Sequence, residues 1–447
     1  EFYRECKKHE INPNIGIEAY FCDDRHVKAK PQTEYGALDG TDKRYYHLTL
    51  LAENNTGYHN LIKASSDSYL TGHYFKPRMD WDSISEYSEG LIAASGCLGG
   101  PVLQPLLHER YDVALEAAAR LQDIFGKENF FIEMMDHGLP EQKKTNPQLL
   151  SIAKKLDAPL LVTLDCHYTH SHDATAHSSL LCLQTGAKLS DPKRFKFNGS
   201  GYYLQDPADV RHQFRDNISA CDNTLAINER CNVTIDFDSM HLPDFPVPNG
   251  YATDFQYLES LAFKGLLAKS NIPSQEYYDR LTYELGVIKS MGVSSYFLIL
   301  WDVINFCKRE EMLTPPGRGS SASSLVAYCL GITKVDPIEY GLVFERFLNP
   351  GRSALPDVDL DIEQRYREKL IQYTRDKYGD DHVAQIITYG TIKARSAVRD
   401  AARVLGHEPK LGDKLAKMMP PLVSGFDTPL YACLREDPQY EQGFRNA

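Results

Sequence analysis

Short apolar runs alternate with amphipathic segments across the first part of the chain. The runs have strand length and are rich in aliphatic and aromatic side chains; they cover residues 15–21, 46–51, 90–94, 129–134 and 159–164. Helical periodicity covers residues 111–125 and 148–156, between the last three runs. Alternating strands and helices predict an α/β fold with a parallel sheet, either open or closed into a barrel.

The pattern changes after residue 236. Residues 236–250 contain three prolines and the turn dipeptide Asn249-Gly250, which predict a connector. Helical patterns follow at residues 255–267 and 277–291, and the apolar run 325–330 continues as a helix after a segment rich in glycine and serine. The second part of the chain therefore reads as a separate, mainly helical region.

Three carboxylates alternate with apolar residues at Asp357, Asp359 and Asp361. A strand alternates its side chains with period two, so these carboxylates would share one face. Such a face suits Mg²⁺, which prefers hard oxygen ligands, and paired ions can clamp the attacking and leaving oxygens of a phosphate transfer. The simpler alternative is a solvated edge strand or an acidic turn.

The glycine-serine segment is Pro316-Gly317-Arg318-Gly319-Ser320-Ser321-Ala322-Ser323-Ser324. Its glycines allow close approach of a ligand to the backbone, and the free N–H groups of the following helix favour a phosphate. The segment also satisfies the G-x-G-x-x-A dinucleotide pattern, but Thr314-Pro315-Pro316 precedes it where that pattern needs a strand. A P-loop is excluded because no Gly-Lys-Ser/Thr follows.

Polar residues gather at or directly after the predicted strands of the first part. They are Glu18, His47, Cys97, Glu133, Asp136, His137, Asp165 and His167. Residues at the carboxyl ends of strands converge on one mouth of an α/β barrel, where histidine, carboxylate and thiolate can bind metal. Individually, Cys97 is equally compatible with a small buried hydrophobe and His47 with a core histidine.

Composition places the chain among ordinary soluble proteins. It has 447 residues, 42% hydrophobic and 25% charged, so about three domains are expected. No apolar run approaches the ~20 residues of a membrane span, and the ten cysteines form no C-x-x-C pair, which favours a cytoplasmic protein without disulfides or zinc ribbons. The net charge of −12 argues against nonspecific coating of nucleic acid but permits a local basic surface.

Two basic segments are candidates for nucleic-acid contact. Arg395, Arg399 and Arg403 recur at i, i+4 and i+8, so on a helix they share a face that can follow phosphates or simply be solvated. The run 193–197, Lys-Arg-Phe-Lys-Phe, combines basic and aromatic side chains. His170, His172 and His177 read as surface residues rather than further ligands.

The stretch 284–405 resembles the palm of the C family of bacterial replicative DNA polymerases, the DNA polymerase III alpha subunits. The matching motifs are the glycine-serine segment, Phe344 to Arg352 (FERFLNPGR), Pro356 to Asp361 (PDVDLD) and Gln385 to Thr391 (QIITYGT). The resemblance implies that Asp357 and Asp359 are catalytic and bind Mg²⁺, and that Gly319, Ser320, Arg346 and Arg352 bind the nucleotide. Ser323 and Gly351 depart from the family pattern, which has glycine and glutamate there.

The first part is similar to the polymerase and histidinol phosphatase (PHP) domain of the same family. The matching stretches surround Glu18, His47, Cys97, Asp165 and His167. The resemblance implies that these residues bind Zn²⁺ or Mn²⁺ within a distorted (β/α)7 barrel. The remaining family ligands belong to an upstream segment that has no counterpart in this sequence.

The resemblance predicts an α/β multidomain chain. It implies a PHP domain at 1–226, an incomplete α+β palm like that of family X polymerases at 227–388, and a partial helical thumb at 389–447. Lys393, Arg395, Arg399 and Arg403 would then bind DNA. Expected partners are primed template DNA, deoxynucleoside triphosphates, a sliding clamp and other replicase subunits, with no membrane.

Three functions stay open at this point. The leading one is a fragment of a replicative polymerase that is inactive alone, because no third catalytic carboxylate is matched. The second is a metal-dependent phosphoesterase or nuclease centred on the PHP domain. The third is a non-enzymatic docking scaffold, with the error-prone branch of the same family as a variant of the first.

Overall fold

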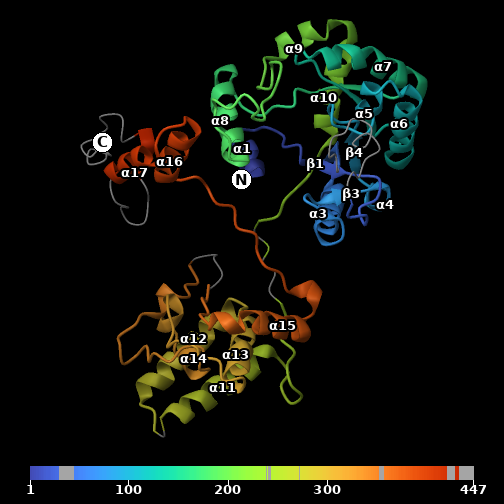
Figure 1. Cartoon of the computed structure of the whole chain (residues 1–447). Helices are drawn as coiled ribbons and strands as arrows, with labels where there is room; N and C mark the ends of the chain where they lie inside the picture. Colours follow the sequence, from blue (N-terminus) through green and yellow to red (C-terminus); the bar gives the residue numbers. More distant parts are fainter. Residues whose placement is uncertain are drawn as a thin grey trace. The chain divides into compact units, whose positions relative to one another are not determined.

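The computed structural model describes residues 1–29, 45–237, 239, 243–270, 272–351, 357–419 and 428–431. The chain divides into two compact units (Figure 1). Unit 1 joins Glu1–Asp236 with Thr391–Ala447, and unit 2 is Phe237–Gly390. The described helices after residue 390, expected as the start of a thumb, thus contribute their contacts to unit 1.

A six-stranded mixed sheet forms the centre of unit 1, in the order β3-β1-β2-β4-β5-β6. The strands are β1 (Gly16–Phe21), β2 (Tyr46–Ala52), β3 (Arg78–Met79), β4 (Leu91–Ala94), β5 (Phe130–Met134) and β6 (Leu160–Val162). The five predicted strands are confirmed, whereas the two-residue strand β3 was missed because it is too short to show alternation.

The expectation of a parallel sheet is only partly correct. β1 and β2 pair antiparallel, as do β2 and β4, while β1–β3, β4–β5 and β5–β6 are parallel. Parallel neighbours require a crossover, and helices α6 (Tyr111–Phe125) and α7 (Pro140–Leu156) supply it between β4, β5 and β6. In the described residues β3 and β6 lie at opposite ends of the strand order, so the sheet does not close into a barrel there.

Unit 1 contains both helices that pack on this sheet and helices that lie apart from it (Figure 1). Those of unit 1 are α1 (Phe2–Lys8), α3 (Asn55–Leu70), α4 (Trp81–Glu86), α5 (Leu103–Leu107), α6 (Tyr111–Phe125), α7 (Pro140–Leu156), α8 (Ala174–Thr185), α9 (Pro207–Gln213), α10 (Ile218–Arg230), α16 (Ala394–Val404) and α17 (Pro409–Met418). One continuous core joins the sheet to α3, α6 and α7 through residues such as Leu48, Leu61, Leu121 and Ile152.

Local chemistry sets the entry of α3. The Asn54 side chain accepts a hydrogen bond from the Gly57 N–H at 3.1 Å and caps the helix. A Cβ at Gly57 would lie 1.8 Å from the carbonyl oxygen of Gly90, so only glycine allows the helix to approach the turn before β4 this closely.

Unit 2 is helical in the residues that the structure describes. Its helices are α11 (Asp254–Lys269), α12 (Gln275–Ser290), α13 (Ser294–Arg309), α14 (Leu325–Cys329) and α15 (Arg367–Tyr378). They enclose a second core that includes Leu258, Leu285, Phe297 and Phe344. The predicted helices at 255–267 and 277–291 are confirmed as α11 and α12.

The predicted strand at 357–362 does not form in the described part of unit 2, where this segment is extended but belongs to no sheet. Its alternation is nevertheless real, because the three aspartates are exposed while Val358, Leu360 and Ile362 pack against the apolar clusters of the unit. The Val358 N–H donates to the Tyr296 hydroxyl at 3.1 Å instead of to a neighbouring strand. A side-chain pattern can specify an extended backbone, but a strand also needs a partner for its ladder.

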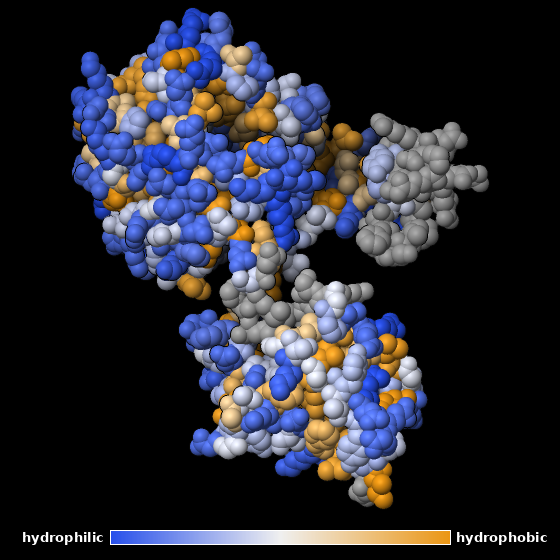
Figure 2. Space-filling model, turned by 180° about the vertical axis from the view of Figure 1, so that it is seen from behind, coloured by the Kyte–Doolittle hydropathy of each residue, from blue (hydrophilic) through white to orange (hydrophobic). Residues whose placement is uncertain are grey.

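Within the described residues, no single helix has the length and apolarity to cross a membrane; α12 and α13 meet that test only as a pair, bent by 115°. The nine cysteines in the described ranges are all unpaired thiols. On the face of unit 1 seen in Figure 2, polar residues predominate and apolar ones are scattered in small groups.

Candidate functional site

A compact cluster in unit 1, the metal-ligand cluster, consists of Glu18, His47 and Cys97. Their potential ligand atoms all lie within 4.8 Å of one another, and no other such group of three occurs among the residues that the structure describes. His47 Nδ1 lies 2.8 Å from Glu18 Oε1 and 3.6 Å from Cys97 Sγ. One carboxylate, one imidazole and one thiol are a donor set that fits zinc, with the carboxylate and imidazole also suited to manganese.

The sheet register creates this cluster. His47 lies opposite Tyr20, so Glu18 and His47 are diagonal neighbours on one face of the antiparallel β1–β2 pair. Cys97 follows β4, which pairs with β2 on its other side. A Cβ on Gly96, whose φ is +82°, would lie 2.5 Å from the His47 carbonyl oxygen, so glycine allows the turn to bring the thiol beside the imidazole.

Asp165 and His167 lie beside this cluster. Their side chains approach to 3.8 Å, and His167 Nδ1 lies 2.6 Å from the Asp165 carbonyl oxygen. The hydrogen bond with His47 lowers the pKa of Glu18, and the charge of His167 acts in the same direction, so His167 is within electrostatic reach. Asp165 adopts a left-handed φ of +45°, a strained conformation for a residue other than glycine, of the kind that concentrates at functional sites.

The buried carboxylate of Glu133 connects the segments that carry the cluster through hydrogen bonds. Glu133 on β5 accepts hydrogen bonds from Thr49 Oγ1 (3.2 Å), Thr163 Oγ1 (2.6 Å) and the Gly96 N–H (2.9 Å). Burial raises the pKa of Glu133, and these three donors oppose that rise. Glu133 therefore joins β2, the Gly96 turn and the segment after β6, which is a positioning role rather than that of an exposed ligand.

The charge state of His47 predicts how metal affinity depends on pH. Burial alone would lower the pKa of His47, but its hydrogen bonds and charge interactions with Cys97 and Glu18 raise it to about 10. Below that pH the imidazole carries a proton that a metal must displace. We expect the apparent Zn²⁺ affinity to rise about tenfold per pH unit, or more, between pH 7 and 9, measured by competition with a chelator.

An ordinary histidine would be deprotonated already above about pH 7 and would release no proton to the metal there, so only proton release by Cys97 could make the affinity rise. A plateau between pH 7 and 9 would therefore contradict the raised pKa of His47. His212, an exposed histidine on α9, provides the control, since His212→Ala should leave the profile unchanged.

His177 lies on the helix after the loop, as expected, and outside the metal-ligand cluster, but it is not fully exposed. It is half-buried on α8, and its ring centroid lies 5.3 Å from that of His167 and 5.1 Å from that of Phe197. Burial lowers the pKa of His177, and the charge of His167 adds to the effect. His170 and His172 are exposed, as expected.

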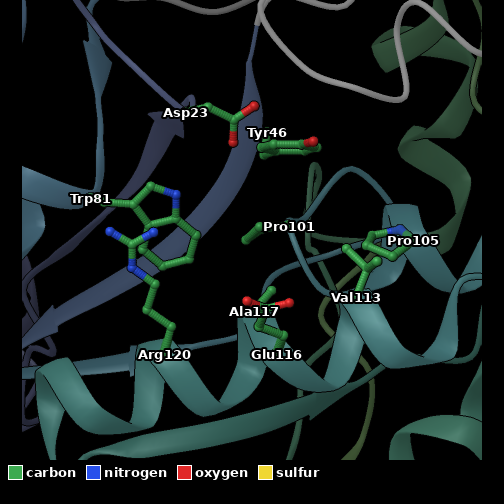
Figure 3. Close-up of a pocket in the computed structure, with 9 residues that line it drawn as sticks. All are labelled: Asp23, Tyr46, Trp81, Pro101, Pro105, Val113, Glu116, Ala117 and Arg120. Carbon is green, nitrogen blue, oxygen red and sulfur yellow. The ribbon is translucent and has the colours of Figure 1, made fainter.

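A cavity of about 160 Å³ lies on the face of the sheet opposite the metal-ligand cluster (Figure 3). Tyr46, the neighbour of His47 on β2, lines it, and successive residues of a strand point to opposite faces. The Arg120 guanidinium lies over the Trp81 ring, 4.1 Å from its centre. This cavity is therefore separate from the metal-ligand cluster.

In unit 2, the glycine-serine segment lines a cavity of about 390 Å³. The cavity is lined by Gly319, Ser320, Ala322, Ser323, Gly341, Leu342, Val343 and Arg346. Gly319 has a φ of +69°, and a Cβ there would lie 3.7 Å from Asp359 Oδ2. The structure thus brings Gly319, Ser320 and Arg346 to one cavity with Asp359 nearby, whereas Arg352 lies outside the described residues.

The expectation that the first N–H groups of α14 bind a phosphate is wrong. Glu284 from α12 occupies it: the carboxylate accepts hydrogen bonds from the Leu325 and Val326 N–H groups at 3.0 Å each, and from Ser324 Oγ at 2.9 Å. Ser324 Oγ in turn accepts from the Ala327 N–H. The first N–H groups of α14 are therefore already bonded, and an anion in this cavity would meet the loop and Arg346 instead.

Arg280 completes this arrangement. It donates to Glu284 at 2.7 Å and to the carbonyl oxygens of Ser323 and Leu342 at 2.9 and 3.1 Å, so it ties together two walls of the cavity. Glu284 and Arg280 were missed from the sequence. The available signal was a carboxylate at position 284 between the core residues Leu281 and Leu285, four residues after an arginine.

The carboxylates of the extended segment are paired with an arginine. The Arg318 guanidinium lies 3.1 Å from Asp359 Oδ2 and 3.3 Å from Asp361 Oδ2. Asp359 and Asp361 thus point to the same side, as the alternation predicts. Both are about half exposed, so an incoming cation can compete with Arg318 for these oxygens.

The predicted arginine stripe lies on α16, but its arginines have protein partners. Arg395 donates to the Met419 carbonyl oxygen at 3.2 Å, Arg399 pairs with Asp413 on α17 at 2.8 Å, and Arg403 lies 3.9 Å from Asp400. Lys393 directly precedes the helix as its N-cap. The first two contacts hold α16 to α17 and its C-terminal end, the third lies within α16, and DNA binding by the stripe stays a prediction.

Two family models match the chain. Residues 1–137 match the PHP domain, and residues 256–445 match the bacterial DNA polymerase III alpha NTPase domain. The first match includes Glu18, His47 and Cys97, and the second includes the glycine-serine segment and all three aspartates.

Curated relatives match nearly the whole chain. Proteins named DNA polymerase III subunit alpha are 42% identical in Saccharopolyspora erythraea and in Mycobacterium tuberculosis, over 99% of this chain, and 38% identical in Treponema pallidum, over 100%. In each comparison the chain spans 38% of the relative's own length.

Proposed function

The chain belongs to the family of bacterial DNA polymerase III alpha subunits, and we propose that it carries part of the nucleotide-transfer site of such a polymerase. The longer protein catalyses template-directed DNA synthesis, in which a primer 3′-hydroxyl attacks the α-phosphate of a deoxynucleoside triphosphate. The reaction takes place in the bacterial cytoplasm.

One observation carries this proposal. Gly319, Ser320 and Arg346 line a single cavity, and the carboxylate of Asp359 lies beside Gly319. A cationic and hydroxyl-lined recess suits a triphosphate, and adjacent exposed carboxylates suit a divalent ion.

Each residue has a distinct role in the proposed reaction. Ser320 and the loop backbone orient the triphosphate, and Arg346 neutralises its charge. Asp357 and Asp359 would hold Mg²⁺, which supplies charge stabilisation at the transferred phosphate. Arg318 is the cation nearest Asp359 and Asp361, so it keeps these carboxylates on the side of Gly319.

The wider assignments follow from the family. We propose primed template DNA, deoxynucleoside triphosphates, a sliding clamp and further replicase subunits as partners of the longer protein. A closed (β/α)7 barrel, an α+β palm, the 1–226, 227–388 and 389–447 boundaries, and nucleotide binding by Arg352 belong to the same proposal.

Primer extension tests the proposal directly. The full reading frame that contains these residues should extend a primed template with deoxynucleotides and Mg²⁺ and should stop when Mg²⁺ is chelated. Failure of a folded full-length protein to extend any primer would overturn the assignment.

Arg346→Ala tests the cavity within this chain. Among the described residues the Arg346 guanidinium has no side-chain or backbone acceptor, so it is available to a phosphate. We expect the substitution to raise the Kd for a fluorescent deoxynucleotide about 10- to 100-fold in the presence of Mg²⁺, since charge-assisted hydrogen bonds are the strong ones. Arg367→Ala is the matched control, because Arg367 is an exposed arginine of unit 2 that forms an ion pair, within the described part of the chain, only with its neighbour Glu368. Equal effects of the two substitutions would contradict this role.

The cluster of Glu18, His47 and Cys97 favours a second activity. We propose that the PHP region binds Zn²⁺ or Mn²⁺ and hydrolyses phosphodiesters of nucleic acid, with Asp165 and His167 contributing ligands. Elemental analysis should find metal that falls in His47→Ala and stays in His212→Ala. Hydrolysis that persists in metal-free His47→Ala protein would contradict this activity.

A further inference from the structure

A row of aromatic rings leads outward from the metal-ligand cluster. This aromatic ladder consists of His137, Tyr202, Phe197 and Phe195. Tyr202 stacks on His137, with ring centroids 4.0 Å apart and an interplanar angle of 9°. Phe197 lies 4.9 Å from Tyr202 and 4.5 Å from His167, and Phe195 follows at 5.8 Å from Phe197. Exposure increases along this aromatic ladder, from 6% for Tyr202 to 58% for Phe195.

Hydrogen bonds fix the two inner rings of the ladder, those of His137 and Tyr202. The Tyr202 hydroxyl donates to the Asn198 carbonyl oxygen at 2.8 Å, and the Ser200 N–H donates to the His137 carbonyl oxygen at 3.0 Å. The buried His137 ring lies between Gln142 and the Leu164 carbonyl oxygen, at 2.9 Å from each. The inner rings are therefore preorganised, which lowers the entropic cost of binding a flat ligand.

The loop that carries Phe195 and Phe197 is basic in an acidic chain. Residues 186–200 contain four basic side chains and one carboxylate, whereas the whole chain carries a net charge of −12. Lys193 and Lys196 are exposed and form no ion pair with any described residue. Arg194 turns back to the Leu189 carbonyl oxygen at 3.2 Å and closes the loop. Two lysine charges thus remain available beside an exposed aromatic ring.

We propose that the exposed Phe195 ring stacks a nucleobase at the end of a single-stranded nucleic acid, with the Phe197 ring, inclined at 69° to it, against the edge of the base, while Lys193 and Lys196 contact its phosphates. The inference deepens the phosphodiesterase activity proposed for the PHP region, and it rests on that activity for the role of the bound end. Bases stacked on aromatic side chains contribute about 1–3 kcal/mol each, largely independent of sequence. The contact of Phe197 with His167 would place the phosphate next to the stacked base near the metal-ligand cluster.

This arrangement selects single strands with a terminal base. A paired terminal base must give up its base pair, and part of its stacking, before it can enter the loop beside the metal-ligand cluster, which costs free energy. An abasic end or a small phosphomonoester has no ring to stack. The ladder therefore adds a base-dependent step to binding that the metal ligands alone cannot supply.

Binding with metal chelated tests the ladder separately from hydrolysis. The probes are a short fluorescein-labelled single-stranded oligonucleotide and the same oligonucleotide with an abasic 3′-terminal residue, followed by anisotropy. Removing the terminal base should weaken binding to the unsubstituted chain by about 5- to 100-fold, and Phe195→Ala should abolish this difference. Phe195→Trp should keep it, while Phe195→Leu, which retains apolar area without a π face, should lose it.

Two further variants make the test specific. Lys196→Ala should weaken both probes equally and reduce the salt dependence by about one charge. Leu225→Ala, which removes an apolar side chain 61% exposed on α10, should change neither Kd. Equal binding of the two probes by the unsubstituted chain, or equal loss for both in Phe195→Ala, would overturn the stacking role. Base-dependent binding without hydrolysis after metal is restored would support the ladder and count against the phosphodiesterase activity instead.

Discussion

Asp357→Ala and Asp359→Ala are each expected to lower kcat for nucleotide incorporation by about 10³-fold or more in the full-length polymerase. Removing one carboxylate would remove a ligand of Mg²⁺, whose positive charge is needed most in the transition state, when negative charge develops as the phosphoryl group moves between two oxygens. The loss should therefore appear in kcat, with a smaller change in KM, in single-nucleotide incorporation kinetics.

Asp361→Ala is the matched control for this prediction. Asp361 has nearly the same side-chain exposure as Asp359, 54% against 50%, and pairs with the same Arg318. The family resemblance excludes it from the catalytic pair, so we expect kcat to stay within about tenfold of the unsubstituted enzyme. Equal losses in Asp359→Ala and Asp361→Ala would show that the effect arises from an unpaired Arg318 rather than from loss of a metal ligand.

Glu284→Ala is expected to lower the free energy of unfolding of unit 2 by about 3–5 kcal/mol, the range found when one partner of a buried ion pair is removed. Glu284 is fully buried and accepts from Arg280, Ser324 and two backbone N–H groups of α14. Alanine would leave all four donors without this acceptor. Glu284→Gln should cost less, because its amide oxygen still accepts.

The two tryptophans allow unit 2 to be observed by itself. Trp301 packs against the core of unit 2 and Trp81 against that of unit 1, and the chain has no others. In a Trp81→Phe background, urea unfolding followed by tryptophan fluorescence reports unit 2 alone. Glu276→Ala, which removes an exposed carboxylate from the first turn of α12, should change the free energy of unfolding by less than about 0.5 kcal/mol.

A double variant separates the ion pair from the helix cap. In Arg280→Met/Glu284→Leu the charges are gone, but the Leu325 and Val326 N–H groups remain unpaired, so most of the loss should persist. Full recovery of stability would contradict the capping role of Glu284. Stability is also linked to function here, since Arg280 holds the Ser323 and Leu342 backbones that line the nucleotide cavity.

Local patterns predicted the elements well. Residues 46–50 alternate between apolar and polar side chains, and in β2 Tyr46, Leu48 and Leu50 are buried while His47 and Thr49 face the other side. The helix predicted at 111–125 is α6 with the same bounds. These successes have a common cause, because strand and helix periodicity is a property of adjacent residues and needs no knowledge of distant ones.

The site in unit 1 could be predicted only in part. The residue types and their positions after strands suggested a metal site, but Glu18, His47 and Cys97 meet through the antiparallel register of β1 with β2 and of β2 with β4. A parallel barrel would also have brought them to one mouth, but at the carboxyl ends of neighbouring strands rather than at diagonal positions of an antiparallel pair. Strand order depends on contacts between residues far apart in sequence, which periodicity does not contain.

The sequence by itself determined which backbone positions need glycine and which side chains point to the same side of an extended segment. Gly319 with a φ of +69° and the alternation of Asp357, Asp359 and Asp361 are both readable from residue type and spacing. Tertiary structure alone decided what these residues contact. Glu284, about forty positions before α14, takes the N–H groups that a phosphate was expected to bind, and Tyr296 takes the backbone N–H that a neighbouring strand was expected to bind. The physical reason is that a hydrogen-bond donor is satisfied by whichever acceptor the fold brings nearest, and that acceptor need not be close in sequence.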